Sequence, residues 1–145
     1  MVQVLQKITF MEIDLSHREF DYEGNDLKIS IRMVPEPYQM PDGAIVDVIG
    51  DINLYSAQAI TDLVDHLIKS EKLKVFLNLF DVNYIDSSGL GAFISSQIKL
   101  KKNGGFLRLF APSKSVGYVL TLTKLGNFLQ IHDDFPAAMD SYNQS

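Results

Sequence analysis

The order of apolar segments along the chain is the feature that most restricts its fold. Short runs rich in β-branched, aliphatic and aromatic residues alternate with longer segments whose apolar residues recur at helical spacing. The runs expected to form strands cover residues 27–34, 44–50, 74–80, 106–111 and 128–132. Strands that alternate with helices are typical of an α/β domain with a largely parallel sheet.

The first two strands are joined differently from the others. Residues 27–34 alternate apolar and polar side chains, which is the pattern of a strand with one buried face. The next segment, PEPYQMPDG, contains three prolines and a glycine and is too short for a helical crossover. We therefore expect an antiparallel first pair within a mixed, mostly parallel sheet of four to five strands, with about four helices packed over it.

Helices are predicted after each of the later strands. The segment 56–72 places apolar residues on one face, and Ser56 precedes it as the expected N-cap. A second helix leads to KKNGG, a third begins where Ser113 or Ser115 can cap it, and DDFPAAMDSYNQ forms the last. The helices and strands together define one predicted domain, residues 27–145.

Residues 1–26 are predicted to form an N-terminal arm. Val2, Val4, Ile8 and Phe10 keep a two-residue spacing, which suggests one extra strand. The acid-rich remainder ends in the turn cluster EGND, so a loosely held tail is the alternative. Such an arm can cover a sheet edge, add partner specificity or mediate dimerisation, and a homodimer is therefore one expectation.

Composition removes several classes of function. The chain of 145 residues contains no cysteine, which excludes disulfides, Cys-ligated zinc and thiol catalysis. A net charge of -5 disfavours binding to nucleic acid, because proteins that bind phosphate backbones usually carry a basic surface. The histidines do not cluster with acids at metal-ligand spacing, and no apolar run approaches the roughly 18 residues of a membrane span. We expect a cytoplasmic protein without metal or cofactor.

The stretch NYIDSSGLGAF places two adjacent serines, Ser87 and Ser88, between a strand and a helix. One interpretation is structural: Asp and Ser cap helices, and Gly89 and Gly91 allow the helix to approach the sheet closely. Another is a catalytic serine, which needs a base within hydrogen-bond reach. Only His132 is a candidate base, and the stretch matches neither the G-x-S-x-G elbow nor a phosphate-binding loop.

A third interpretation is a serine that accepts a phosphate. A helical wheel places Ser88 on a small, polar stripe with Ala92, Ser95 and Lys99, away from the sheet. Ser87 lies near the edge of the opposite face. We therefore predict Ser88 as the phosphorylation site, Ser87 as a cap, and the stripe as the partner-binding surface. A phosphate adds about -1.5 to -2 charges, which a helix N-terminus tolerates, so it would alter binding without unfolding the protein.

Two stretches resemble the STAS domain family, in particular bacterial anti-sigma factor antagonists. NLFDVNYIDSSGLGAF is similar to the family's strand, loop and D-S-S-G-L-G phosphorylation segment. VIGDINLYSAQAITDLVDHL is similar to the turn and helix that precede that segment. The resemblance covers about residues 27–142, including the order of the elements.

The resemblance implies a regulatory switch and no enzymatic activity. Such antagonists bind an anti-sigma factor that is also a serine kinase, are released when it phosphorylates the second serine of the motif, here Ser88, and are reset by a serine phosphatase. The residues implied to support the phosphorylation site are Asp51, Asn53, Asp86, Ser87, Gly89 and Gly91.

The sequence departs from the family pattern at Asn53, where the family often has Asp. This removes one carboxylate near the phosphorylation site, although Asp51 and Asp86 remain. A charge-dependent role in phosphotransfer is weakened, whereas local hydrogen bonding can survive. The alternative function is a constitutive STAS interaction module, without phosphorylation, in a stress-signalling or transporter-associated complex.

Overall fold

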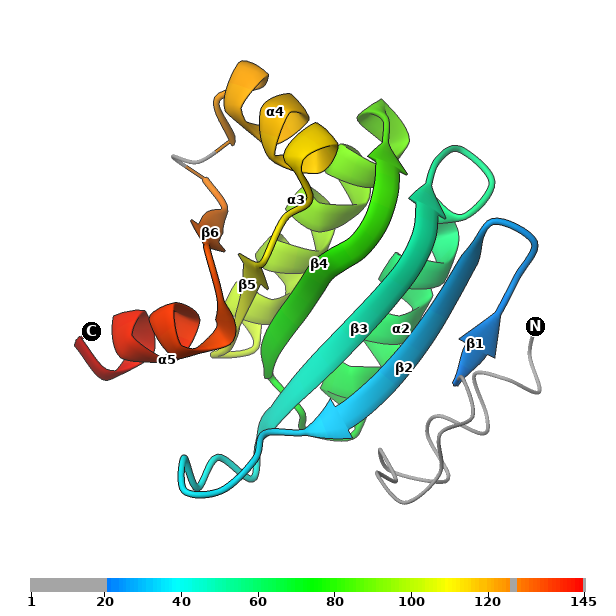
Figure 1. Cartoon of the computed structure of the whole chain (residues 1–145). Coiled ribbons are helices and arrows are strands. Elements are labelled where there is room, and N and C mark those ends of the chain that lie inside the picture. The colour runs from blue at the N-terminus through cyan, green and yellow to red at the C-terminus, as the bar shows by residue number, and fades with distance from the viewer. Residues whose placement is uncertain (1–20, 126–127, 145) are drawn as a thin grey trace.

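A six-stranded sheet with the order β1-β2-β3-β4-β5-β6 forms the centre of the computed structural model, which describes residues 21–125 and 128–144 (Figure 1). The strands are β1 (Tyr22–Glu23), β2 (Leu27–Met33), β3 (Gly43–Ile52), β4 (Lys74–Ile85), β5 (Phe106–Phe110) and β6 (Gln130–His132). The helices of the described residues are α2 (Ala57–Lys69), α3 (Ser87–Lys102), α4 (Lys114–Leu122) and α5 (Phe135–Gln144). These elements confirm the predicted α/β fold.

The sheet is mixed, as the sequence predicts. β2 pairs with β3 antiparallel, from Leu27 opposite Gly50 to Met33 opposite Ala44, and this confirms the antiparallel first pair. The pairs β3–β4, β4–β5 and β5–β6 are parallel. The sixth strand is β1, two residues that pair antiparallel with β2. The strand predicted from Val2 to Phe10 lies outside the described residues.

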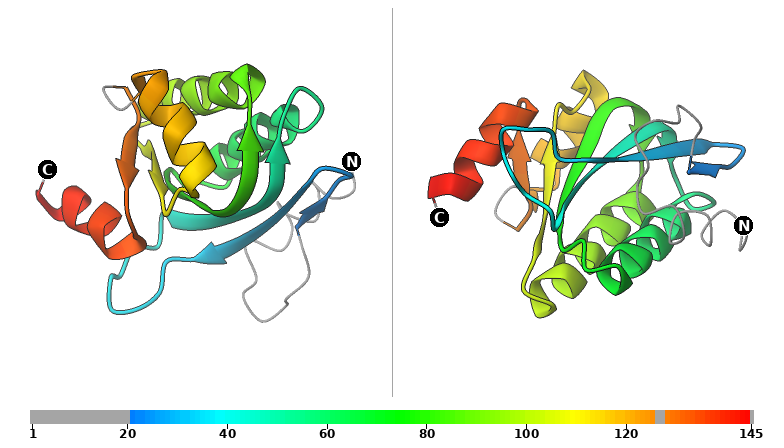
Figure 2. Two further views of the ribbon diagram at one scale, coloured as in Figure 1. Left: turned by 45° about the horizontal axis from the view of Figure 1, so that its top comes forward. Right: turned by 90° about the horizontal axis from the view of Figure 1, so that it is seen from below.

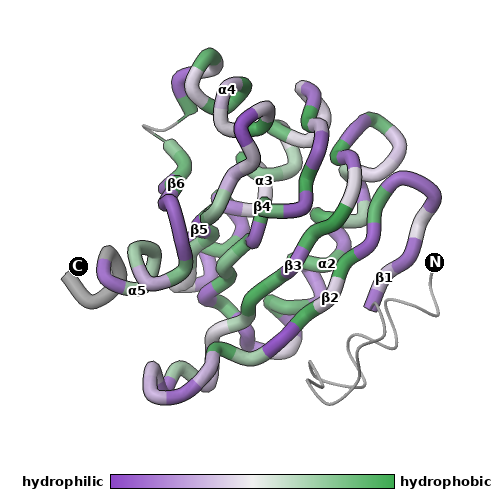
Figure 3. Tube along the Cα trace, viewed as in Figure 1, coloured by the Kyte–Doolittle hydropathy of each residue, from purple (hydrophilic) through white to green (hydrophobic). Residues whose placement is uncertain are grey.

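Two hydrophobic clusters lie on opposite faces of the sheet. Figure 2 shows α2 and α3 side by side against one face, where the larger cluster includes Ala44, Val46 and Phe93. Ile45, between two of these residues, belongs instead to a smaller cluster with Phe76 and residues of α5. Neighbouring strand residues point to opposite faces, so β3 contributes to both clusters. Figure 3 shows much of β3 in the hydrophobic colour, interrupted by hydrophilic positions.

β4 extends beyond the predicted strand of residues 74–80. Two irregularities interrupt its pairing with β3. Asp47 lies opposite Asn78 but Ile49 lies opposite Asp81, and Gly50 lies opposite Val82 but Asp51 lies opposite Tyr84. One extra residue of β4 is accommodated at each place, as in a β-bulge. Polar residues near these bulges interrupt the apolar pattern. For this reason the sequence did not predict the full length of the strand.

Candidate functional site

The carboxyl ends of β3 and β4 lie side by side and bring the predicted site residues together. The two strands are parallel, and Ile52 lies opposite Ile85 at the end of their pairing. The backbone N–H of Asp86 then donates to the carbonyl oxygen of Ile52 across 3.2 Å. The turn after β3, which contains Asn53, therefore adjoins the turn after β4, which contains Ser87 and Ser88.

Asp86 is the N-cap of α3. Its carboxylate Oδ1 accepts the backbone N–H of Ser88 at 2.9 Å and that of Gly89 at 3.3 Å, while its own backbone is extended. A capping side chain satisfies amides that have no partner within the helix. The predicted cap role of Ser87 is wrong, because Ser87 is already the first residue of the helix and its side chain is exposed. Ser88 is partly exposed.

The two glycines of the motif have different surroundings. A Cβ atom on Gly89 would lie 2.6 Å from Ile85 Cγ1, 2.8 Å from Ile52 Cγ2 and 3.0 Å from the Ile52 carbonyl oxygen. Gly89 therefore allows α3 to begin against the end of β3, as predicted. A Cβ atom on Gly91 would meet no atom within 4 Å, so Gly91 is not required for packing against the sheet.

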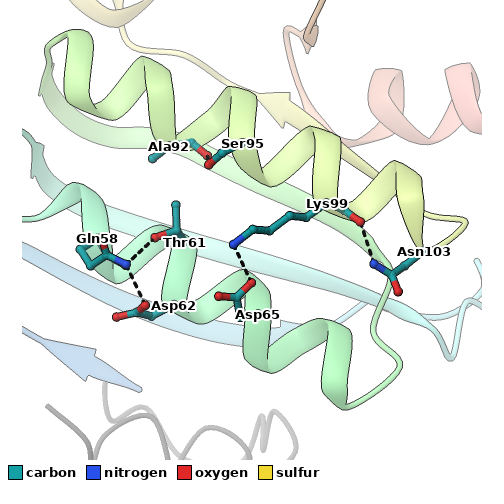
Figure 4. Close-up of polar contacts among 8 residues, drawn as sticks. All are labelled: Gln58, Thr61, Asp62, Asp65, Ala92, Ser95, Lys99 and Asn103. Carbon is teal, nitrogen blue, oxygen red and sulfur yellow. Dashed lines mark hydrogen bonds and ion pairs between the residues drawn. The ribbon is translucent and has the colours of Figure 1, made fainter.

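The predicted stripe of Ser88, Ala92, Ser95 and Lys99 does not form an outward face of α3. Figure 4 shows Ala92, Ser95 and Lys99 on the side of α3 that faces α2. Ala92 is only 5 % exposed, and Lys99 Nζ forms an ion pair with Asp65 of α2 at 3.0 Å. The helical wheel took into account only the packing of α3 on the sheet. In the structure α2 packs against this side of α3, so the stripe does not face solvent.

The outer side of α3 carries other residues. Ser87, Gly91 and Ile98 are exposed there, although the sequence assigned Ser87 to a cap and Gly91 to close packing on the sheet. A helix packed against both a sheet and a second helix buries a wider arc than a helix packed on a sheet alone. The partner-binding role of the stripe therefore stays a prediction, and only its Ser88 end lies beside the turn after β3.

The turn after β3 is held by reciprocal hydrogen bonds between Asn53 and Ser56. Asn53 Oδ1 accepts the backbone N–H groups of Tyr55 at 2.9 Å and Ser56 at 3.1 Å. Ser56 Oγ accepts the backbone N–H of Asn53 at 2.9 Å and donates to the carbonyl oxygen of Asp51 at 2.6 Å. Ser56 precedes α2 as predicted, but its side chain caps no amide of that helix.

Leu54 and Tyr55 lie on this turn with their side chains in solvent. Leu54 is 69 % exposed and Tyr55 is 84 % exposed, although the backbone that carries them is hydrogen-bonded. Sequence reasoning missed both residues, because it treated the turn only as the connection between a strand and a helix. The signal was present: two apolar residues stand between the end of an apolar strand and the N-cap of an amphipathic helix.

His132, the one candidate base in the sequence, lies on β6 at the far end of the strand order from β1. Burial and the nearby positive charge of Arg108 lower the pKa of its imidazole, and Asp133 opposes this shift. Its Nε2 atom lies 3.5 Å from Oε1 of Gln130. No contact of His132 with Ser87 or Ser88 therefore supports a catalytic pair.

Other candidate sites lie elsewhere. A cleft of about 520 Å³ between α4 and the end of β6 is lined by Pro112, Gly117, Leu120, Thr121, Lys124, Ile131 and Asp133. Within the described ranges, no group of three or more His, Asp and Glu side chains could hold a metal ion. Among the helices of these same ranges, none combines the length and the hydropathy of a membrane span.

The family model of the STAS domain matches residues 35–138. The chain belongs to the STAS domain family. A Thermotoga maritima protein named "Putative anti-sigma factor antagonist" is 31% identical over 106 residues, which cover 72% of this chain and 94% of that protein. The anti-sigma-B factor antagonist of Bacillus subtilis is 33% identical over 87 residues, 59% of this chain and 78% of that protein.

A solved structure shows the same fold. The Bacillus cell fate determinant SpoIIAA in its phosphorylated form superposes with a TM-score of 0.58, covering 79% of this chain and 98% of SpoIIAA, at 17% identity. At this identity the likeness concerns the fold alone. The family match and the named relatives support the general role of a STAS protein of the anti-sigma factor antagonist type.

Proposed function

We propose that this chain is an anti-sigma factor antagonist that acts in the bacterial cytoplasm. In its unmodified state it binds an anti-sigma factor with serine kinase activity, and phosphorylation of Ser88 releases that partner. The observation that carries this proposal is the Asp86-capped turn beside Ile52. It presents a partly exposed serine at the start of a helix, next to a second exposed turn.

The Ser88 side chain is available for modification. The backbone N–H of Ser88 is bonded to Asp86, and no hydrogen bond of the Ser88 hydroxyl is present within the described part of the chain. A phosphate on this oxygen would lie in the first turn of α3, where the helix dipole favours an anion. The fold therefore tolerates the modification.

The added charge acts on the partner and on the turn itself. A phosphate brings about -1.5 to -2 charges next to the Asp86 carboxylate, and close like charges repel. A partner packed against Ser88 would also have to desolvate the phosphate. Regulatory couplings are typically 1–3 kcal/mol, which corresponds to roughly 5- to 150-fold in affinity. A serine phosphatase that removes the phosphate would restore binding.

Phosphorylation by the cognate anti-sigma factor kinase tests the site. After incubation with ATP, the intact mass should increase by one phosphate, located at Ser88 by fragmentation. Ser88→Ala should abolish this increase. Ser87→Ala is the matched control, because Ser87 is the adjacent and more exposed hydroxyl, and this variant should still gain one phosphate. A fully phosphorylated Ser88→Ala protein would contradict the assignment.

A charge substitution tests the switch. Ser88→Glu should weaken binding of the kinase at least fivefold, measured by calorimetry, because the carboxylate imitates part of the phosphate charge. Its far-ultraviolet circular dichroism spectrum should match that of the unmodified protein. Equal affinities of the two proteins would contradict release by charge.

The alternative function is a constitutive STAS interaction module without phosphoregulation. Asn53 favours it, because this residue supplies hydrogen bonds but no carboxylate at the edge that holds Ser88. This alternative predicts that the chain stays unmodified with kinase and ATP. It also predicts that affinity purification recovers a large stress-signalling or transporter-associated assembly in place of a small kinase.

A further inference from the structure

The turn between β3 and α2 combines a restrained backbone with exposed apolar side chains. Leu54 and Tyr55 are among the most exposed large hydrophobic residues of the described chain, at 69 % and 84 %. The hydrogen bonds of Asn53 and Ser56 close the turn from both ends, and Ser56 itself is only 3 % exposed. The fold thus holds two apolar side chains in water.

The fold itself gives no packing role to these two side chains. Neither Leu54 nor Tyr55 belongs to the two hydrophobic clusters of the described residues. Burying one such side chain typically contributes about 1.5–3 kcal/mol, and this free energy is unused in the isolated chain. Aromatic residues are also enriched at the centres of protein interfaces.

The turn is continuous with the edge that carries the proposed acceptor serine. The Ile52 carbonyl, one residue before Asn53, accepts the N–H of Asp86, and the first turn of α3 packs on Ile52 through Gly89. A protein that receives Ser88 in a catalytic groove must therefore cover or contact the adjacent turn. Because the turn and Ser88 lie on the same edge, the protein that covers Leu54 and Tyr55 is taken to be the one that phosphorylates Ser88.

We propose that Leu54 and Tyr55 are docking residues that enter an apolar recess of the anti-sigma factor kinase, and that Asn53 is the residue that positions them. This inference rests on the proposed function, since the partner is the one that modifies Ser88. It also gives Asn53 a role that needs no charge. Its Oδ1 atom holds Tyr55 and Ser56, and an aspartate oxygen can accept the same two hydrogen bonds.

Binding measurements with paired variants test the docking residues. The probe is the purified kinase that phosphorylates the wild-type chain at Ser88. Leu54→Ser and Tyr55→Ser should each weaken binding about tenfold or more, as expected for apolar anchors. The matched controls are Leu122→Ser and Tyr118→Ser on α4, which remove side chains that are 61 % and 66 % exposed. Both controls should bind within about twofold of the wild type.

Two substitutions separate the positioning role of Asn53 from its charge. Asn53→Ala should weaken kinase binding and, in the free protein, speed amide hydrogen exchange at Tyr55, whose N–H donates to Asn53 Oδ1. Asn53→Asp should retain the slow exchange and the wild-type affinity, because it keeps the acceptor oxygen. Unchanged exchange in Asn53→Ala would overturn the positioning role.

The outcomes distinguish this inference from the function on which it rests. If no kinase modifies Ser88 of the wild-type chain, the proposed function is wrong and the docking role is lost with it. If the kinase modifies Ser88 and the double variant Leu54→Ser, Tyr55→Ser binds as tightly as the wild type, only the docking role is wrong.

Discussion

The backbone N–H of Asp86 donates to the carbonyl oxygen of Ile52 across 3.2 Å, and this hydrogen bond joins the two turns of the candidate site. Both turns leave the sheet at the ends of parallel strands, so the pairing of β3 with β4 sets their relative position. The side chain of Ile52 also contacts the start of α3 at Gly89. Changes in packing at Ile52 are therefore transmitted to the turn that carries Ser88.

The two glycines of the motif should respond to alanine in opposite ways. Gly89→Ala should lower the free energy of unfolding by about 1–3 kcal/mol, because its Cβ overlaps Ile85, Ile52 and a backbone oxygen. Gly91→Ala should raise it by about 0.5–1 kcal/mol, since alanine favours the helix and this position is open. Urea unfolding measures both. A destabilised Gly91→Ala protein would show that Gly91 has a packing role.

Loss of the α3 cap should destabilise the protein. Asp86→Ala removes the acceptor of the Ser88 and Gly89 amides and should lower the free energy of unfolding by about 0.5–2 kcal/mol. Asp86→Asn is the control, because it keeps an acceptor oxygen and should cost much less. Thermal unfolding of the two variants under identical conditions makes the comparison, and equal losses would argue against capping.

The ion pair between α2 and α3 should contribute little to stability. Lys99 Nζ lies 3.0 Å from Asp65 Oδ1, but the two side chains are 45% and 44% exposed. Water and salt screen such pairs, so a double-mutant cycle with Lys99→Ala and Asp65→Ala should give a coupling below about 1 kcal/mol. A coupling well above this value would show that the seam between the helices depends on the charge pair.

The protein should lose stability as the pH falls below neutrality, in part through His132. Burial and the Arg108 charge lower the pKa of His132 in the folded state. The unfolded state therefore binds more protons below a pH of about 6.5, and folding becomes less favourable there. The free energy of unfolding of His132→Gln should fall less between pH 7.5 and 5.5. Parallel pH curves for the two proteins would contradict this contribution.

The sequence predicted the elements of the fold well because each has a local pattern. The alternation in β2 and the helical spacing in α2 come from burial of one face, which each segment records by itself. The antiparallel pair β2–β3 followed from a loop too short for a crossover. The length of β4 was missed because bulges between Asn78 and Asp81 and between Val82 and Tyr84 interrupt its apolar pattern.

The sequence predicted that the candidate residues lie close together, but not how they are arranged. The sequence placed Asp51, Asn53, Asp86 and Ser88 in one region, and the ends of β3 and β4 bring their turns together. It assigned the cap to Ser87, yet both Asp86 and Ser87 can cap a helix and only the start of α3 decides between them.

Local residue patterns by themselves determined the α/β fold, the family resemblance and a serine at the start of a helix. Only the tertiary structure decided which flank of α3 is covered, since α2 lies there and Asp65 meets Lys99. It alone shows Leu54 and Tyr55 held in solvent beside the serine turn. The physical reason is that exposure depends on neighbours distant in the sequence, whereas the tendency to form a strand, helix or cap depends on residues close by.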